Sequence, residues 1–258
     1  MRPLAVVTGA SAGLGAVFAR QLTARGYDLV LTARRADRLN ALATELGRNG
    51  AACQAVAADL SEDSGIEAVA DVIQTRRPDL LVNNAGFGTK GRFHEADFAG
   101  QHTMHRVHVM ATLRLTHAAL GPMVERGSGG IINVSSVAGF ARSPGNVSYC
   151  ATKSWMNAFT EALVLEMRAL QSPVRIQALC PGFTYTEFHD VMQVSRDRVP
   201  RTLWLDADFV VGESLRALDR GQWLVIPDWR YRWFVALITR LPARLRLAMQ
   251  SRSPHSRA

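Results

Sequence analysis

Short apolar runs alternate with longer amphipathic segments over the first two thirds of the chain. The short runs contain mainly branched aliphatic residues, which is typical of strands in a parallel sheet that is covered on both faces. The longer segments carry apolar residues at helical spacing. This repetition of strand and helix predicts one α/β domain with a doubly wound parallel sheet flanked by helices. The predicted strands are 4–8, 28–32, 52–57, 80–83, 130–135 and 174–180, and the predicted helices are 13–25, 35–48, 61–76, 97–125 and 150–171.

The pattern changes after Pro181. From Trp229 to Met249, aromatic and aliphatic residues are interleaved with arginines, and Pro242 is expected to kink or interrupt the helix that they form. The sequence therefore divides into a domain over 1–228 and a basic, amphipathic C-terminal extension over 229–258. The remaining predicted elements of the domain are an aperiodic segment at 184–205, a helix at 206–220 and a last strand at 222–226.

Composition places the chain among ordinary globular proteins. Its 258 residues suit one large α/β domain, and 48% of them are hydrophobic and 20% charged. Cys53, Cys150 and Cys180 lack metal-type spacing, which predicts free thiols in a reducing compartment. A strand starts too early to leave room for a secretory signal, and no apolar run reaches about 18 residues. We therefore expect a cytoplasmic protein without a membrane-spanning helix.

The net charge of +8 belongs largely to the extension. No acidic residue follows Asp228, whereas seven arginines do, and the rest of the chain is close to neutral. This distribution gives no basic footprint for nucleic acid on the fold itself. The extension fits a helix that packs on its own subunit or on a partner, and it also fits an amphipathic helix at a membrane surface. No metal site is predicted, because the histidines at 102, 105 and 117 lack a supporting carboxylate or cysteine cluster.

A glycine-rich turn joins the first predicted strand to the first helix, with the sequence TGASAGLG over 8–15. Glycines let the backbone turn sharply and approach a pyrophosphate closely. The N-terminus of the helix then meets the anion with free N–H groups and its positive dipole end. The turn predicts a dinucleotide-binding site formed by Gly9, Ser11, Ala12, Gly13, Leu14 and Gly15.

Two arginines end the second predicted strand. A ribose with a free 2′-hydroxyl usually meets an acidic residue there, but this chain has Thr32 and Ala33, followed by Arg34 and Arg35. A guanidinium group suits a 2′-phosphate, so the sequence predicts NADP(H) rather than NAD, with Arg34 as the main contact. Arg35 either shares that role or is a solvated arginine at the start of a helix.

Tyr149 and Lys153 lie four residues apart on a predicted helix, so their side chains share one face. A nearby ammonium and a positively charged nicotinamide are expected to lower the tyrosine pKa from about 10 toward neutrality, which would make it a general acid or base. Ser136, at the end of the fifth strand, can hydrogen-bond the same substrate oxygen. Among 30 lysines and arginines, only Lys90 and Lys153 are lysine, so background usage does not account for the lysine here.

These segments together resemble the short-chain dehydrogenase/reductase family over residues 4–228. The resemblance implies a Rossmann-type fold, an NADP-dependent oxidoreductase and, as is common in that family, a homo-oligomer. The matching segments are TGASAGLG at 8–15, Asp59-Leu60, NNAG at 83–86, Ser136, YCATK at 149–153, and Pro181-Gly182 with Thr184 and Thr186.

The resemblance also implies roles for these residues. Ser136, Tyr149 and Lys153 would be catalytic, and the last two would also bind the cofactor. Asp59 and Leu60 would hold the adenine ring. The other cofactor contacts would come from Asn84, Ala85, Gly86, Pro181, Gly182, Thr184 and Thr186.

One position departs from the family. Its fourth active residue is an asparagine in a segment like VN(V/L)xA, and the matching stretch here is VHVMA, which places His108 at that position. Histidine can exchange hydrogen bonds with water, so a proton relay through Lys153 could survive. The alternative is that His108 is a satisfied core histidine and that the relay runs differently.

The sequence thus predicts hydride transfer between NADPH and a carbonyl or secondary alcohol, with Tyr149 as general acid and base. A substrate lid is expected over 184–204, where Phe188, Val191, Met192 and Trp204 favour an apolar substrate or pack within the protein. One alternative is a reductase of lipid-like carbonyls at a membrane surface. The other, a non-catalytic NADP-binding sensor, would not need the three predicted catalytic residues together.

Overall fold

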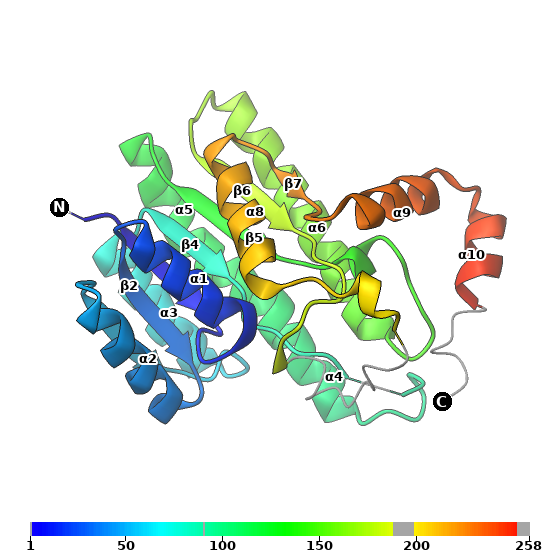
Figure 1. Ribbon diagram of the computed structural model, residues 1–258, viewed down its shortest axis with the longest axis horizontal. Coiled ribbons are helices and arrows are strands. Elements are labelled where there is room, and N and C mark those ends of the chain that lie inside the picture. Colours follow the sequence, from blue (N-terminus) through cyan, green and yellow to red (C-terminus); the bar gives the residue numbers. More distant parts are fainter. Residues whose placement is uncertain (1, 90, 188–198, 252–258) are drawn as a thin grey trace.

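A computed structural model describes residues 2–89, 91–187 and 199–251. Its centre is a parallel sheet of seven strands in the order β3-β2-β1-β4-β5-β6-β7, with helices on both faces (Figure 1). The strands are β1 (Leu4–Thr8), β2 (Asp28–Ala33), β3 (Cys53–Ala57), β4 (Leu80–Asn83), β5 (Gly130–Val134), β6 (Arg175–Leu179) and β7 (Leu224–Val225). The predicted Rossmann-type sheet is confirmed, and six strands begin and end within one residue of prediction; the last strand is shorter than predicted.

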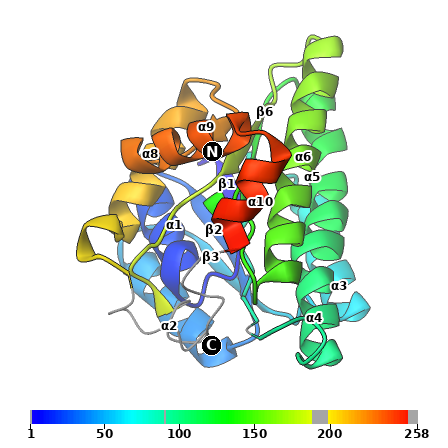
Figure 2. The ribbon, with the colours of Figure 1, turned by 90° about the vertical axis from the view of Figure 1, so that its right-hand side faces the viewer.

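The helices form two layers, one on each face of the sheet, as Figure 2 shows edge-on. Helices α1, α2 and α8 cover one face, and α3, α5 and α6 cover the other. Successive residues of a strand point to opposite faces, so Ala5 and Val7 join the first core whereas Val6 joins the second. The helices of these layers are α1 (Gly13–Ala24), α2 (Ala36–Arg48), α3 (Asp63–Arg76), α5 (Thr112–Arg126), α6 (Val147–Ala169) and α8 (Ala207–Asp219).

The single helix predicted over 97–125 contains a wider turn. An α-helix, α4 (Phe98–His105), continues into a π-helical turn over Arg106–Ala111 and then into α5. Asp97 caps its start by accepting hydrogen bonds from the backbone N–H groups of Ala99 and Gly100. A π turn inserts extra backbone into the helix, and such turns often occur at functional sites. His108 lies in this turn.

The extension forms two helices, α9 (Trp229–Arg240) and α10 (Ala243–Ser251). The break between them falls at Pro242, as predicted. One face of α9 packs into the core through Tyr231, Val235 and Ile238. No residue of α10 is buried. Figure 1 shows both helices at one end of the molecule, beyond β7. Within the described residues, no helix is long and apolar enough to cross a membrane.

Candidate active site

One large cavity lies at the carboxyl ends of the strands, where ligands of doubly wound sheets bind. Its volume of about 1250 Å³ exceeds the roughly 300–1,000 Å³ of a pocket for one small molecule. Nearly all the residues predicted for the site line it, although they come from distant parts of the sequence. They are Gly9, Ser11, Ala12, Gly13, Leu14, Arg34, Arg35, Asp59, Leu60, Asn84, Ala85, Gly86, Ser136, Tyr149, Lys153, Pro181, Gly182, Thr184 and Thr186.

The glycine turn has the geometry of an anion cradle. Gly9 and Gly13 adopt the left-handed conformation, with φ of 65° and 55°. A Cβ on Gly15 would lie 2.3 Å from the carbonyl oxygen of Gly9, so this glycine lets α1 start tightly against the turn, although it does not line the cavity. No side chain caps the start of α1 at Ala12, so the N–H groups there suit an anionic ligand. The cradle fits the pyrophosphate of a dinucleotide.

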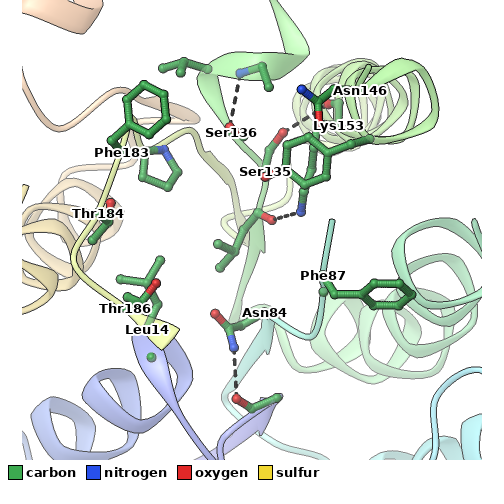
Figure 3. A pocket seen from close by; sticks show the side chains of 18 of the residues that line it. Leu14, Asn84, Phe87, Ser135, Ser136, Asn146, Lys153, Phe183, Thr184 and Thr186 are labelled. Atoms are coloured by element: carbon green, nitrogen blue, oxygen red, sulfur yellow. Dashed lines mark hydrogen bonds between the residues drawn. The ribbon is translucent and has the colours of Figure 1, made fainter. Parts of the chain in front are cut away.

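The loop after β4 is fastened to the glycine turn. Asn84 Nδ2 donates to the carbonyl oxygen of Thr8 at 2.8 Å, and the backbone N–H groups of Asn84 and Ala85 donate to Thr8 Oγ1. The Thr8 hydroxyl donates in turn to the carbonyl oxygen of Val82. In Figure 3, Asn84 and Leu14 lie together at one side of the cavity. These bonds set the shape of the nucleotide end before any ligand binds.

Arg34 and Arg35 both reach the cavity, but they have different partners. The Arg34 side chain is 68% exposed, and its guanidinium lies 4.0 Å from Asp59. Arg35 donates to Ser11 Oγ in the glycine turn and lies 3.4 Å from Glu187, which also pairs with Arg38 at 2.9 Å. Arg35 is therefore not merely solvated. Glu187 was not predicted, because nothing in the sequence indicates that it contacts an arginine some 150 positions earlier.

Ser136, Tyr149 and Lys153 meet on the opposite side of the cavity. Ser136 and Tyr149 line the same cavity, and the Ser136 side chain acts on the phenol to lower its pKa. Lys153 is buried; its Nζ lies 5.9 Å from the centre of the Tyr149 ring and donates to the carbonyl oxygen of Val134 at 2.7 Å. Figure 3 shows Lys153 and Ser135 beside the end of β5, across the cavity from Thr184 and Thr186.

The predicted lowering of the Tyr149 pKa is wrong, because the protein's own surroundings raise this pKa. Burial raises the pKa of Tyr149 to about 12, because desolvation disfavours the phenolate more than the hydrogen bond from Ser136 favours it. Burial likewise lowers the pKa of Lys153 to about 8. Lys153 is not among the groups that lower the pKa of the tyrosine. At neutral pH, Tyr149 therefore carries its proton.

His108 lies behind the cavity wall rather than in it. The side chain is fully buried, and its Nε2 accepts a hydrogen bond from the backbone N–H of Phe87 at 3.1 Å. Nδ1 lies 2.9 Å from Thr152 Oγ1. Neither nitrogen bonds to Lys153 or to the Tyr149 hydroxyl, so the geometry does not support the relay reading of His108.

The extension contributes to the cavity through Arg230, Tyr231 and Phe234. The Tyr231 ring covers Gly182 so closely that a Cβ on this glycine would lie 2.0 Å from a ring carbon. Its hydroxyl donates to the carbonyl oxygen of Leu203 at 2.6 Å and accepts from the backbone N–H of Phe183 at 3.1 Å. Tyr231 thereby joins the two segments that border this end of the cavity. The sequence pattern indicated an amphipathic helix here, but not that its buried face closes the site.

Only part of the predicted substrate lid lies within the described residues. Phe188, Val191 and Met192 lie outside the described residues. Trp204 is buried and does not line the cavity, because its ring stacks on Tyr185 with 4.9 Å between ring centres. It is a packing residue. The described residues contain no cluster of three or more histidines, cysteines or carboxylates that could hold a metal ion.

Fold and cavity together are those of a dinucleotide-binding α/β protein. The family model for short chain dehydrogenases matches residues 3–196. The chain is also 34% identical over 192 residues to sulfoacetaldehyde reductase 2 of Chromohalobacter salexigens, an alignment that covers 73% of this chain and 75% of that protein. It therefore belongs to the short-chain dehydrogenase family, as the sequence motifs predicted, and is an NAD(P)-dependent oxidoreductase that acts on CH–OH or C=O groups.

Solved structures extend the similarity to the C-terminal helices. A short-chain dehydrogenase from Sphingobium yanoikuyae in complex with NADPH is 33% identical, with a TM-score of 0.84 and coverage of 98% of this chain and 97% of that one. The bulky-bulky ketone specific alcohol dehydrogenase from Comamonas testosteroni is 28% identical, with a TM-score of 0.80 and coverage of 98% and 96%.

Proposed function

We propose that this protein uses NADPH to reduce apolar ketones or aldehydes to alcohols, or catalyses the reverse oxidation, with Tyr149 as general acid and base. The observation that carries the proposal is the position of the Tyr149 hydroxyl. Tyr149 lines the same cavity as Ser136 and the glycine turn, so a proton donor and a nucleotide cradle face one space.

The nicotinamide, when bound, supplies or accepts the hydride. Tyr149 holds its proton at neutral pH, since its pKa is about 12, and it can donate that proton to a carbonyl oxygen. The Ser136 hydroxyl can hydrogen-bond the same oxygen as negative charge develops on it. Lys153, whose Nζ lies 5.9 Å from the centre of the Tyr149 ring, lines the same cavity and is proposed as a contact for the cofactor.

NADP(H) is the proposed cofactor because two guanidinium groups border the nucleotide end of the cavity. Arg34 is largely exposed there and Arg35 reaches Ser11 of the glycine turn, so both can bind a 2′-phosphate. The Sphingobium relative, described in complex with NADPH, agrees with this assignment.

The substrate end favours an apolar molecule. Phe183, Leu203, Val199 and Phe234 border it, and the cavity is large enough for a substrate beside a dinucleotide. The Comamonas relative is described as specific for bulky-bulky ketones, which agrees with such an end. The reductase of Chromohalobacter acts, by its name, on a charged aldehyde, so a charged substrate must be included in the test.

The test is a panel of carbonyl compounds followed by NADPH absorbance. We expect turnover with apolar aryl and alkyl ketones, little with small hydrophilic aldehydes, and little with a sulfonated aldehyde. Preference for the sulfonated compound would contradict the apolar assignment. NADPH binding without turnover of any compound would favour the sensor alternative, which the joint presence of Ser136, Tyr149 and Lys153 argues against.

A second candidate is the same chemistry at a membrane surface, on lipid-like carbonyls. The outward face of α9 exposes Trp229, Trp233 and Leu237, while its inward face borders the cavity. In α10, Leu245 and Leu247 are exposed beside arginines, and no acidic residue lies in the extension. Aromatic and aliphatic residues with flanking arginines are typical of helices that bind anionic lipid surfaces.

Vesicle binding tests this candidate. We expect the protein to sediment with vesicles that contain phosphatidylserine and not with neutral phosphatidylcholine vesicles. The double variant Trp233→Ser, Leu237→Ser should remove binding; it is a better test than deleting the extension, because it leaves Tyr231 in the core. If the protein stays in the supernatant with both vesicle types, the membrane candidate is refuted and the proposed chemistry is unaffected.

A homo-oligomer and a cytoplasmic location stay predictions.

A further inference from the structure

His108 connects two parts of the active site that are distant in sequence. Its Nε2 accepts from the backbone N–H of Phe87, directly after the NNAG loop. Its Nδ1 lies 2.9 Å from the hydroxyl of Thr152, which sits on α6 between Tyr149 and Lys153. One buried ring therefore spans from the loop on the cofactor side to the helix that carries the tyrosine.

The partners fix which ring nitrogen carries the proton. A backbone N–H can only donate, so Nε2 must be the unprotonated acceptor. The proton of the neutral ring then lies on Nδ1, which donates to Thr152 Oγ1. The Thr152 hydroxyl donates onward to the carbonyl oxygen of Tyr149 at 3.0 Å. Every hydrogen-bonding group of the ring is satisfied, and no position remains for a water in a proton relay.

Packing around the ring is equally close. A Cβ on Gly86 would lie 2.7 Å from His108 Nε2, so the imidazole rests against the backbone of the NNAG loop. The rings of Tyr149 and Phe87 meet the imidazole edge-on, with centres 5.9 Å and 6.2 Å away. Figure 3 shows the Phe87 ring directed away from the cavity, among the helices. A shift of the imidazole would therefore move both Gly86 and Tyr149.

We propose that His108 is a positioning residue that sets the distance between the NNAG loop and Tyr149, and that it does not pass protons. The proposal rests on the proposed function, because that spacing matters for catalysis only if Tyr149 protonates a substrate next to the cofactor. An asparagine at this position is too short to reach both Phe87 and Thr152, whereas a glutamine amide offers an acceptor and a donor at a spacing similar to that of the imidazole.

Protonation of the ring would break this arrangement. A proton on Nε2 would face the Phe87 N–H, and the titratable groups around the ring are Lys153, His105 and Tyr149. Burial, followed by the charges of Lys153 and His105, keeps the pKa of His108 well below 6.5, so the ring stays neutral at physiological pH. Loss of activity from this cause is expected only in acid.

The test compares His108→Gln, His108→Asn and His108→Leu in the full-length protein. We expect kcat to fall about tenfold to a hundredfold in the Asn and Leu variants, because a displacement of about 1 Å can cost that much. The Gln variant should retain most of the wild-type kcat and lack the loss of activity in acid. KM for NADPH should change less than kcat. If the Leu variant does not fold, Thr152→Val removes the Nδ1 contact from the other side.

A second readout, independent of turnover, is the hydrogen exchange of the Phe87 amide measured by NMR. Exchange should be faster in the Asn and Leu variants than in the wild type and Gln variant. An Asn variant as active as the wild type, beside an inactive Gln variant, would establish a relay and overturn the proposal. Unchanged exchange in the Leu variant would overturn it as well. If the wild-type enzyme turns over no carbonyl compound, the proposed function fails and the exchange measurement still decides the positioning role.

Discussion

The two ends of the cavity are built differently. The nucleotide end consists mainly of backbone, with the glycine turn and the loop after β4 joined by Thr8 and Asn84. The substrate end consists of side chains from segments after Pro181, held together by Tyr231 and bordered by Phe234. Tyr149 stands between the two ends.

This difference explains what each end can vary. A backbone cradle binds a constant group, the pyrophosphate, and depends on a few glycines at fixed spacing. An end lined by side chains can change its shape by substitution without disturbing the sheet. Damage at the nucleotide end should therefore appear in the Kd for NADPH, damage at the substrate end in KM or substrate preference, and damage at the junction in kcat.

The largest effect is expected at Tyr149, which lies at the junction between the two ends of the cavity. Tyr149→Phe removes the proton donor and keeps the ring, so kcat should fall roughly 10²–10⁴-fold while the Kd for NADPH stays close to that of the wild type. Tyr27→Phe makes the same chemical change beside the core, away from the cavity, and should leave kcat unaltered. Steady-state kinetics with fluorescence titration of NADPH measures both, and full turnover by the Phe variant would contradict the acid–base role.

Arg34→Glu tests the nucleotide end. It replaces a charge-assisted contact to the 2′-phosphate with repulsion, so the Kd for NADPH should rise about tenfold to a hundredfold, whereas NADH binding should hold or improve. Arg48→Glu, on the exposed end of α2, controls for the change in net charge. Equal weakening of both cofactors would show that Arg34 does not recognise the 2′-phosphate.

At the substrate end, Tyr231→Phe keeps the ring on Gly182 and removes its hydrogen bonds to Leu203 and Phe183. A group left without its partner costs about 1–3 kcal/mol, so the segments should loosen and KM for the ketone should rise up to about tenfold. The Kd for NADPH in the same variant is the internal control. A change confined to cofactor binding would show that Tyr231 acts on the nucleotide end and not on the substrate end.

The smallest effect concerns stability. The pKa of Lys153 is lowered in the folded protein to about 8, so the folded state carries a penalty below that pH that fades as pH rises toward 10.5. Lys153→Met removes the buried charge, and the melting temperature of the variant relative to the wild type should be higher by a few degrees near pH 7 than near pH 10. Calorimetry at the two pH values measures it; a difference independent of pH would mean that the ammonium is not destabilising.

Much of this molecule could be predicted from local sequence. Strand and helix positions follow from hydrophobic periodicity, and the glycine turn and the Tyr149–Lys153 pair follow from spacings of a few residues. The contributions of Glu187, Tyr231 and Phe234 could not be predicted, because each depends on contacts with residues far away in the chain. The predicted direction of the Tyr149 pKa shift was wrong because burial, which the spacing does not reveal, dominates, and Lys153 is not among the groups that lower this pKa.

Transfer of deuterium tests the central claim most directly. The protein is mixed with NADPH deuterated at C4 of the nicotinamide and an apolar ketone, and the product alcohol is analysed by mass spectrometry. We predict one deuterium on the carbinol carbon, formed far more slowly by Tyr149→Phe. Tight NADPH binding with no deuterium in any product, or equal transfer by the Phe variant, would contradict the assignment of Tyr149 as the proton donor of a carbonyl reductase.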